Sequence, residues 1–197
     1  EDDSNKLAKE VTRTTAALLT PAIILGIIAM RPFLDIWLAG KLDPVAATIG
    51  EIALFGQWYA SLAVTNMSLI QAQGKPRTFA LLLLCELPFY FALLIGLTNH
   101  FGLVGTAMAS LIRLGVEYVL LTGFALRSWR AFLPYMFPSV LIAATIVIWD
   151  LAYATLGGTT VILALFAGSC IWAWRILPDG VHQFFKSWVV KRLERER

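Results

Sequence analysis

The chain of 197 residues is 58% hydrophobic and only 15% charged, with a formal net charge of +3. A soluble domain of this size carries about 25% charged residues to cover its surface, and the deficit extends along nearly the whole chain, which excludes a soluble globular fold. The basic residues are concentrated in short segments between apolar runs, so they indicate orientation in a membrane and not binding to a nucleic acid.

Six apolar segments are each long enough to cross a bilayer, which takes roughly 20 residues of helix. In chain order they are residues 16–38, 45–70, 79–97, 103–126, 134–154 and 159–177. The sequence therefore predicts an all-α, polytopic membrane helix bundle of six transmembrane helices over residues 16–177. A cytoplasmic N-terminal segment, residues 1–15, precedes it.

The orientation follows from the Lys and Arg residues in the connections. Residues 1–15, the connections 71–78 and 127–133, and residues 178–197 together hold 12 basic residues, whereas the other three connections hold one. The two groups alternate along the chain without exception. Because Lys and Arg favour the cytoplasmic side, the sequence predicts six crossings with both termini in the cytoplasm.

A cytoplasmic amphipathic tail, residues 178–197, is predicted to follow the last span. Its apolar residues, among them Phe185 and Trp188, recur at steps of three and four residues, so they share one face of a helix. Lys191 and Arg192 fall between them. Such a helix lies in the headgroup region of the bilayer and is held partly by anionic lipid. The alternative is a solvated, frayed terminus.

Three charged residues lie deep in the predicted spans, where exposure to lipid is costly. Glu86 is in the third span, while Arg113 and Glu117 are four residues apart in the fourth and hence share one helix face. The third and fourth spans form a tight hairpin, so Glu86 can join the other two. Two interpretations remain open. The trio is either an internal ion pair that locks the hairpin, or a cavity-lining cluster that meets an ionic substrate or carries a coupling proton.

Other polar residues in the spans rank lower as substrate-cavity or coupling candidates. Arg31 and Asp35, also four residues apart, are interpreted as a local pair near the outer interface. Gln57 and Asn66 on the second span either line a path or hydrogen-bond neighbouring helices, and helix packing is favoured. A last group lies near helix ends, where headgroup contact or snorkelling is the ordinary explanation; its members are Glu51, Asp150 and Arg175.

The sequence contains no pattern that supports an enzyme. One of the two histidines lies in an outer turn and one in the tail, and there is no catalytic triad, paired-acid motif, metal-ligand spacing or phosphate-binding loop. Cys85 and Cys170 lie in separate apolar runs and are interpreted as small buried hydrophobes. We therefore expect neither a cofactor nor a metal site.

Two stretches of sequence are familiar. They read Leu69-Ile70-Gln71-Ala72-Gln73-Gly74-Lys75-Pro76-Arg77 and Phe101-Gly102-Leu103-Val104-Gly105-Thr106-Ala107-Met108-Ala109. The first span adds Leu19-Thr20-Pro21, Arg31-Pro32-Phe33-Leu34 and Trp37-Leu38-Ala39-Gly40. Over residues 5–130 the chain resembles the polysaccharide-flippase branch of the multidrug/oligosaccharidyl-lipid/polysaccharide exporter superfamily.

The resemblance implies two pseudo-symmetric helical lobes around a central cavity that opens alternately to the two faces of a bacterial inner membrane. It implies a lipid-linked glycan as the substrate. The family has no signature residue for its substrate, so the resemblance assigns no contact, and Arg113 is our own hypothesis for the residue that faces the anionic headgroup. The similar part is the C-terminal one, so the resemblance also implies a partner, either a missing N-terminal lobe or a second membrane subunit.

The leading hypothesis is thus the C-terminal portion of a flippase-like exporter that moves lipid-linked oligosaccharide or polysaccharide precursor outward by alternating access. One alternative is a drug/cation antiporter of the same superfamily, with Glu86 or Glu117 as the coupling acid. The other is a non-transporting scaffold subunit of a glycan-assembly complex, docked by the basic loops and the tail.

Overall fold

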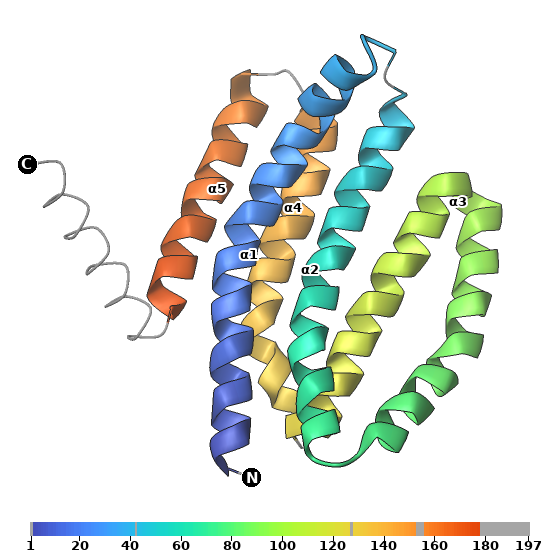
Figure 1. The fold of residues 1–197 in the computed structure, drawn as a ribbon. Coiled ribbons are helices and arrows are strands. Elements are labelled where there is room, and N and C mark those ends of the chain that lie inside the picture. The colour runs from blue at the N-terminus through green and yellow to red at the C-terminus, as the bar shows by residue number, and fades with distance from the viewer. Residues whose placement is uncertain (1, 42, 127, 153–155, 178–197) are drawn as a thin grey trace, which may run out of the picture.

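The computed structural model describes residues 2–41, 43–126, 128–152 and 156–177, and the regular structure within these ranges is entirely helical. The elements are α1 (Asp2–Trp37), α2 (Pro44–Ala72), α3 (Pro76–Leu126), the 3-10 helix η1 (Trp129–Tyr135), α4 (Met136–Ala152) and α5 (Leu156–Ile176). They run up and down in one bundle (Figure 1). The predicted amphipathic tail, with Phe185, Trp188, Lys191 and Arg192, lies outside the described residues.

The longest helix, α3, consists of two arms that meet at Gly102. The backbone of Gly102 has φ 59° and ψ −135°, a conformation that a residue with a Cβ rarely adopts. The first arm rises to this point and the second returns from it (Figure 1). The sequence predicted a connection over residues 98–102, whereas the structure continues the helix through Phe101 and departs from helical geometry at Gly102.

The two arms approach each other closely beside this turn. A Cβ placed on Gly105 would overlap the backbone carbonyl oxygen of Leu97, so the position has no room for a larger residue. The hydroxyls of Thr98 and Thr106 lie 2.9 Å apart across the arms. The two arms are therefore closely packed at Gly105.

Three of the described helices are long and apolar enough to cross a membrane: Asp3–Trp37, Pro76–Leu126 and Arg130–Leu151. α3 has 51 residues, and at ~1.5 Å per residue each of its arms is ~37 Å long, which exceeds the ~30 Å hydrocarbon core of a bilayer. α5 holds a shorter apolar helix, Thr160–Ile176. The fold is thus all-α and of membrane type in the described ranges, while the count of six crossings stays a prediction.

The core of the bundle forms where α1, α2 and the second arm of α3 meet α4 and α5. Trp58 on α2 and Tyr118 on α3 are the bulkiest of its fully buried side chains. The indole nitrogen Nε1 of Trp58 donates a hydrogen bond of 3.1 Å to Oγ1 of Thr20 on α1, which satisfies its one polar group inside an apolar interior. This bond also ties α1 to α2.

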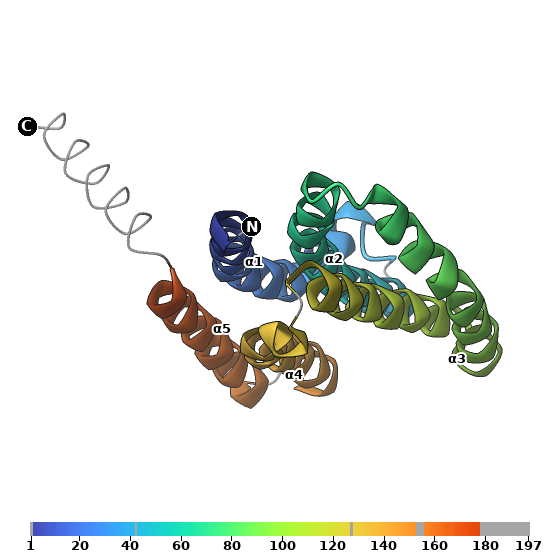
Figure 2. The same ribbon diagram turned by 90° about the horizontal axis from the view of Figure 1, so that it is seen from below.

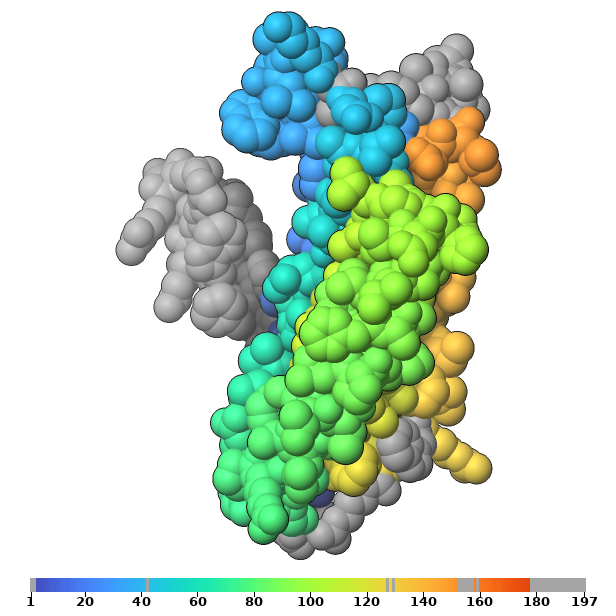
Figure 3. Space-filling view, turned by 90° about the vertical axis from the view of Figure 1, so that its right-hand side faces the viewer, coloured from blue at the N-terminus to red at the C-terminus, as the bar shows by residue number. Residues whose placement is uncertain are grey.

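The first arm of α3 lies at the edge of the bundle away from α5, and its side chains dominate the face seen in Figure 3 (Figures 2 and 3). Leu84 and Ile95 on this arm are 63% and 61% exposed, as expected of side chains that contact lipid. Cys85 on the same arm and Cys170 on α5 are free thiols, and both are exposed. The prediction that they are buried was wrong, because each lies on the outward side of its helix.

Candidate functional site

The structure brings Glu86, Arg113 and Glu117 together between the two arms of α3. Nε of Arg113 lies 3.3 Å from Oε1 of Glu86, and Nη2 of Arg113 lies 3.5 Å from Oε2 of Glu117. The first contact joins the two arms, while the second joins residues one turn apart on the second arm. The hairpin at Gly102 therefore places the three charges as the sequence suggested.

Burial differs among the three side chains. The side chain of Glu86 is 3% exposed and that of Glu117 is 16% exposed, whereas that of Arg113 is 35% exposed. The guanidinium carbon Cζ of Arg113 also lies 5.2 Å from the centre of the Tyr90 ring, a cation–π distance. The carboxylate of Glu86 is thus enclosed, and the guanidinium is the part of the cluster that remains accessible.

A second charge cluster joins three helices and corrects the sequence interpretation of Arg31. Nε of Arg31 on α1 donates a hydrogen bond of 3.1 Å to Oε1 of Glu51 on α2. Its Nη2 pairs with Oδ1 of Asp150 on α4. The sequence had suggested Asp35 as the partner, but Asp35 is exposed one turn further along α1, and the structure gives Arg31 partners on two other helices.

The headgroup or snorkelling interpretation of Glu51 was also wrong. Its side chain is 0% exposed, and its second oxygen, Oε2, is buried without a hydrogen-bond partner among the described residues. Asp150 remains half exposed at 48%, yet it is paired. We refer to Arg31, Glu51 and Asp150 as the Arg31 network. Removing one member of such a buried pair lowers the stability of the fold, because the other charge then stays buried without a partner.

The two amides predicted on α2 have different surroundings. Gln57 is exposed. Asn66 is 1% exposed, and its Nδ2 donates a hydrogen bond of 2.8 Å to Oγ1 of Thr122 on α3. Asn66 therefore hydrogen-bonds a neighbouring helix, as the favoured interpretation predicted.

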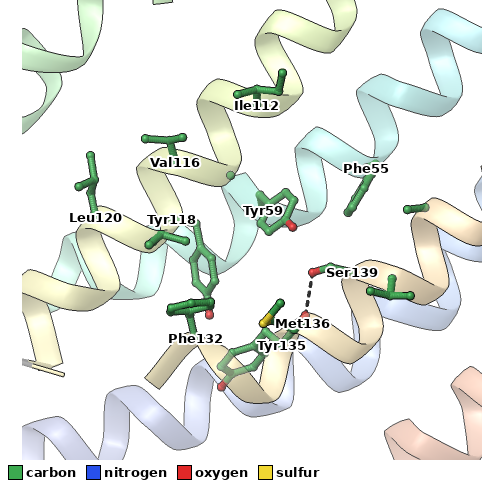
Figure 4. Close-up of a pocket in the computed structure, with 14 residues that line it drawn as sticks. Phe55, Tyr59, Ile112, Val116, Tyr118, Leu120, Phe132, Tyr135, Met136 and Ser139 are labelled. Atoms are coloured by element: carbon green, nitrogen blue, oxygen red, sulfur yellow. Dashed lines mark hydrogen bonds between the residues drawn. The ribbon is translucent and has the colours of Figure 1, made fainter. Parts of the chain in front are cut away.

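An apolar groove lies between α2, the second arm of α3, η1 and α4 (Figure 4). Its volume is about 570 Å³, within the ~300–1,000 Å³ typical of small-molecule sites. Aliphatic and aromatic side chains such as Phe55, Ile112 and Met136 form its walls. The hydroxyl of Ser139, which also lines it, already donates a hydrogen bond of 2.7 Å to the carbonyl oxygen of Tyr135.

A second cavity, of about 510 Å³, lies at the end of the bundle that the sequence assigns to the cytoplasm. Lys9 and Arg13 from α1 and Arg130 from η1 line it, and none of the described residues in its wall is acidic. We call it the basic cavity. Tyr118 and Tyr135 line both the basic cavity and the apolar groove. Their rings are in edge contact, with centroids 6.0 Å apart.

Neither of these two cavities is lined by Glu86, Arg113 or Glu117. Sequence reasoning missed both of them. It had used Lys9, Arg13 and Arg130 only as evidence for orientation. In the described parts of the chain, no group of three His, Cys, Asp or Glu side chains is placed to hold a metal ion.

Comparison with known proteins relates the chain to a protein that bears a transporter's name. Over 101 residues, 51% of this chain, the sequence is 34% identical to a Shigella flexneri protein named "Putative O-antigen transporter". The similar segment covers 24% of that protein's length, so the match extends over less than a quarter of it. No protein-family model and no solved structure matches the chain. The long apolar helices and this similarity together indicate a multi-pass membrane protein related to a transporter.

Proposed function

We propose that this chain is the C-terminal portion of a transporter that moves lipid-linked oligosaccharide or polysaccharide precursor outward across a bacterial inner membrane by alternating access. The observation that carries the proposal is the 34% identity to a protein named as an O-antigen transporter. O-antigen is a polysaccharide, so a substrate of that class is the simplest one for this chain. The other lobe of the machine would come from the rest of the protein or from a second subunit.

The cluster of Glu86, Arg113 and Glu117 supports a role in handling an anionic substrate. An ion pair that served structure alone gains little, because desolvation offsets most of the Coulomb attraction. Here the enclosed Glu86 and the neighbouring Glu117 flank one guanidinium that stays 35% exposed. A guanidinium presents paired N–H groups that match phosphate oxygens. In this proposal Arg113 contacts the phosphate of the substrate, and the two carboxylates position it.

Replacement of Arg113 with Ala, made in the complete protein, is expected to reduce glycan export roughly 10- to 100-fold, the value of one charge-assisted hydrogen bond set. The reason is that the substrate phosphate loses its cationic contact. The measurement is the ratio of lipid-linked glycan on the cytoplasmic face to polysaccharide at the cell surface. It is made in cells whose own gene for this transporter has been deleted. Protein level in the membrane is recorded in parallel.

Two further variants separate a functional role from a structural one. Arg175→Ala removes an exposed arginine from the last turn of α5 and should export normally. The triple variant Glu86→Gln/Arg113→Gln/Glu117→Gln leaves no charge of this cluster unpaired, so it should restore protein level but not export. Normal export by the triple variant would show that the cluster is structural. Loss of export in Glu86→Gln with Arg113 intact, accompanied by loss of ion-dependent drug efflux, would favour the antiporter. Intact export in every variant would show that the cluster has no part in transport and would remove its support for the proposal.

A further inference from the structure

Three cations line the basic cavity without a carboxylate partner among the described residues. Within the described ranges, the ion pairs involve Arg31 and Arg113 and not Lys9, Arg13 or Arg130. All three side chains are exposed and all three converge on one cavity. Basic pockets between membrane helices on the cytoplasmic side attract phosphate-bearing headgroups. The charge of the cavity therefore points to an anionic ligand.

Two buried polar groups in the same wall point to a ligand as well. Nδ2 of Asn66 donates to Oγ1 of Thr122, and that hydroxyl donates a hydrogen bond of 2.7 Å to the carbonyl oxygen of Tyr118. This chain of bonds fixes the amide of Asn66 and leaves its Oδ1 without a hydrogen-bond partner in the part of the chain that the structure describes. The hydroxyl of Tyr118, on a side chain only 2% exposed, has none either. Buried polar atoms are nearly always paired, so the ligand should offer a donor to Asn66 and an acceptor to Tyr118.

The apolar groove continues from the basic cavity toward the middle of the membrane. Tyr118 and Tyr135 form the wall that the two spaces share. Along the second arm of α3, the lining residues extend from Leu126 in the basic cavity, past Tyr118, to Ile112 in the groove, a rise of ~21 Å at ~1.5 Å per residue. Half of a bilayer's hydrocarbon core is ~15 Å thick. A polar head in the cavity and an acyl chain in the groove would thus lie at the depths that a lipid of the inner leaflet occupies.

We propose that the basic cavity and the apolar groove form one site for an anionic phospholipid of the cytoplasmic leaflet with a hydroxyl-bearing head, of the phosphatidylglycerol type. Lys9, Arg13 and Arg130 attract its phosphate, and the Tyr118 hydroxyl donates to a phosphate oxygen. A hydroxyl of the glycerol head donates to Oδ1 of Asn66, and one acyl chain occupies the groove. A zwitterionic head would bring its own cation toward three others. The site goes beyond the transport step proposed above and does not depend on it.

The test reconstitutes the full chain in phosphatidylcholine nanodiscs that contain added phosphatidylglycerol, added phosphatidylethanolamine or neither. Lipid retained after gentle release is measured by native mass spectrometry, and thermal unfolding is followed in the same discs. Phosphatidylglycerol should be retained selectively and should raise the unfolding temperature. The triple variant Lys9→Gln/Arg13→Gln/Arg130→Gln should weaken this binding roughly 10- to 100-fold.

A matched triple variant provides the control. Lys6→Gln/Lys75→Gln/Arg77→Gln removes the same number of charges from the same end of the bundle, and these residues line neither the basic cavity nor the apolar groove. It should bind phosphatidylglycerol as the natural chain does. Equal weakening by both triples would mean general attraction of anionic lipid and would overturn the proposal, as would the absence of any preference for phosphatidylglycerol.

A variant in the groove tests the placement of the chain. Ala143→Phe adds a ring to the groove wall and leaves the three cations unchanged, so it should reduce retention of phosphatidylglycerol but not of soluble glycerol phosphate. Unchanged retention of the phospholipid would refute the groove as its chain site. A polyprenyl-diphosphate-linked saccharide that displaced phosphatidylglycerol at lower concentration would assign the site to the cargo, and the phospholipid proposal would then be wrong.

Discussion

Replacement of Arg31 with Met is expected to remove most of the folded protein from the membrane. The substitution leaves the carboxylate of Glu51, which is 0% exposed, buried without its cation, and Oε2 of Glu51 already lacks a hydrogen-bond partner. Removing one member of a buried pair costs roughly 3–5 kcal/mol, which is a large part of the ~5–15 kcal/mol that stabilises a typical domain. The measurement is the amount of monodisperse protein after detergent extraction, together with its unfolding temperature.

Two comparisons identify the cause of that loss. Arg175→Met makes the same replacement at an exposed arginine and should leave the unfolding temperature unchanged. The double variant Arg31→Met/Glu51→Gln removes the unpaired charge and should recover a substantial part of the stability, since Asp150 is 48% exposed and can reach solvent. If Arg31→Met unfolded at the temperature of the natural protein, the Arg31 network would contribute nothing to stability.

Gly105→Ala is the second substitution for which we expect a large effect. The added Cβ would overlap the carbonyl oxygen of Leu97 and would meet Cβ of Phe101 at 3.1 Å. The first of these is backbone, so the two arms of α3 must separate near their turn. Forcing an extra carbon into a close-packed contact costs roughly 1–3 kcal/mol. We expect a lower unfolding temperature and, because the arms carry the cluster, a longer distance between labels placed on them.

Gly96 offers the matched control on the same helix. A Cβ there has no neighbour within 4 Å, so Gly96→Ala meets no steric barrier and gains ~0.5–1 kcal/mol of helix propensity. The two Gly→Ala changes should therefore move the unfolding temperature in opposite directions. A shift of the same sign and size in both would show that the contact with Leu97 does not limit the hairpin.

The parts of the fold that the sequence predicted are those set by local pattern. The length of the apolar segments predicted the apolar helices. The spacing of four residues placed Arg113 beside Glu117, and the short connection at Gly102 brought Glu86 to them. The same rule failed for Arg31 and Asp35, because an (i, i+4) spacing permits a pair but does not exclude better partners. Glu51 and Asp150 are 20 and 119 residues distant from Arg31, and their register depends on how three helices pack.

The cavities were missed for a related reason. Lys9 and Arg13 lie far in sequence from Arg130, and the positive-inside rule already explained all three. Nothing in the sequence indicated that they converge. Asn66 offered the one partial signal, since an amide within an apolar span needs partners. A hydrogen bond from Asn66 to a neighbouring helix could be expected from the sequence. The unpaired Oδ1 could not, because it depends on the Thr122 hydroxyl donating its proton to the carbonyl oxygen of Tyr118.

The Arg31 network also has a mechanical consequence. Opposite charges join α1, α2 and α4 toward the predicted outer end of the bundle, whereas three like charges from α1 and η1 face one space at the inner end. We therefore expect attraction to hold the first end together and repulsion to favour opening of the second. If the helices of this bundle separate during the proposed transport cycle, we expect the pivot to lie at Arg31 and the largest displacement at the mouth of the basic cavity. An anion resident between Lys9, Arg13 and Arg130 would damp that displacement.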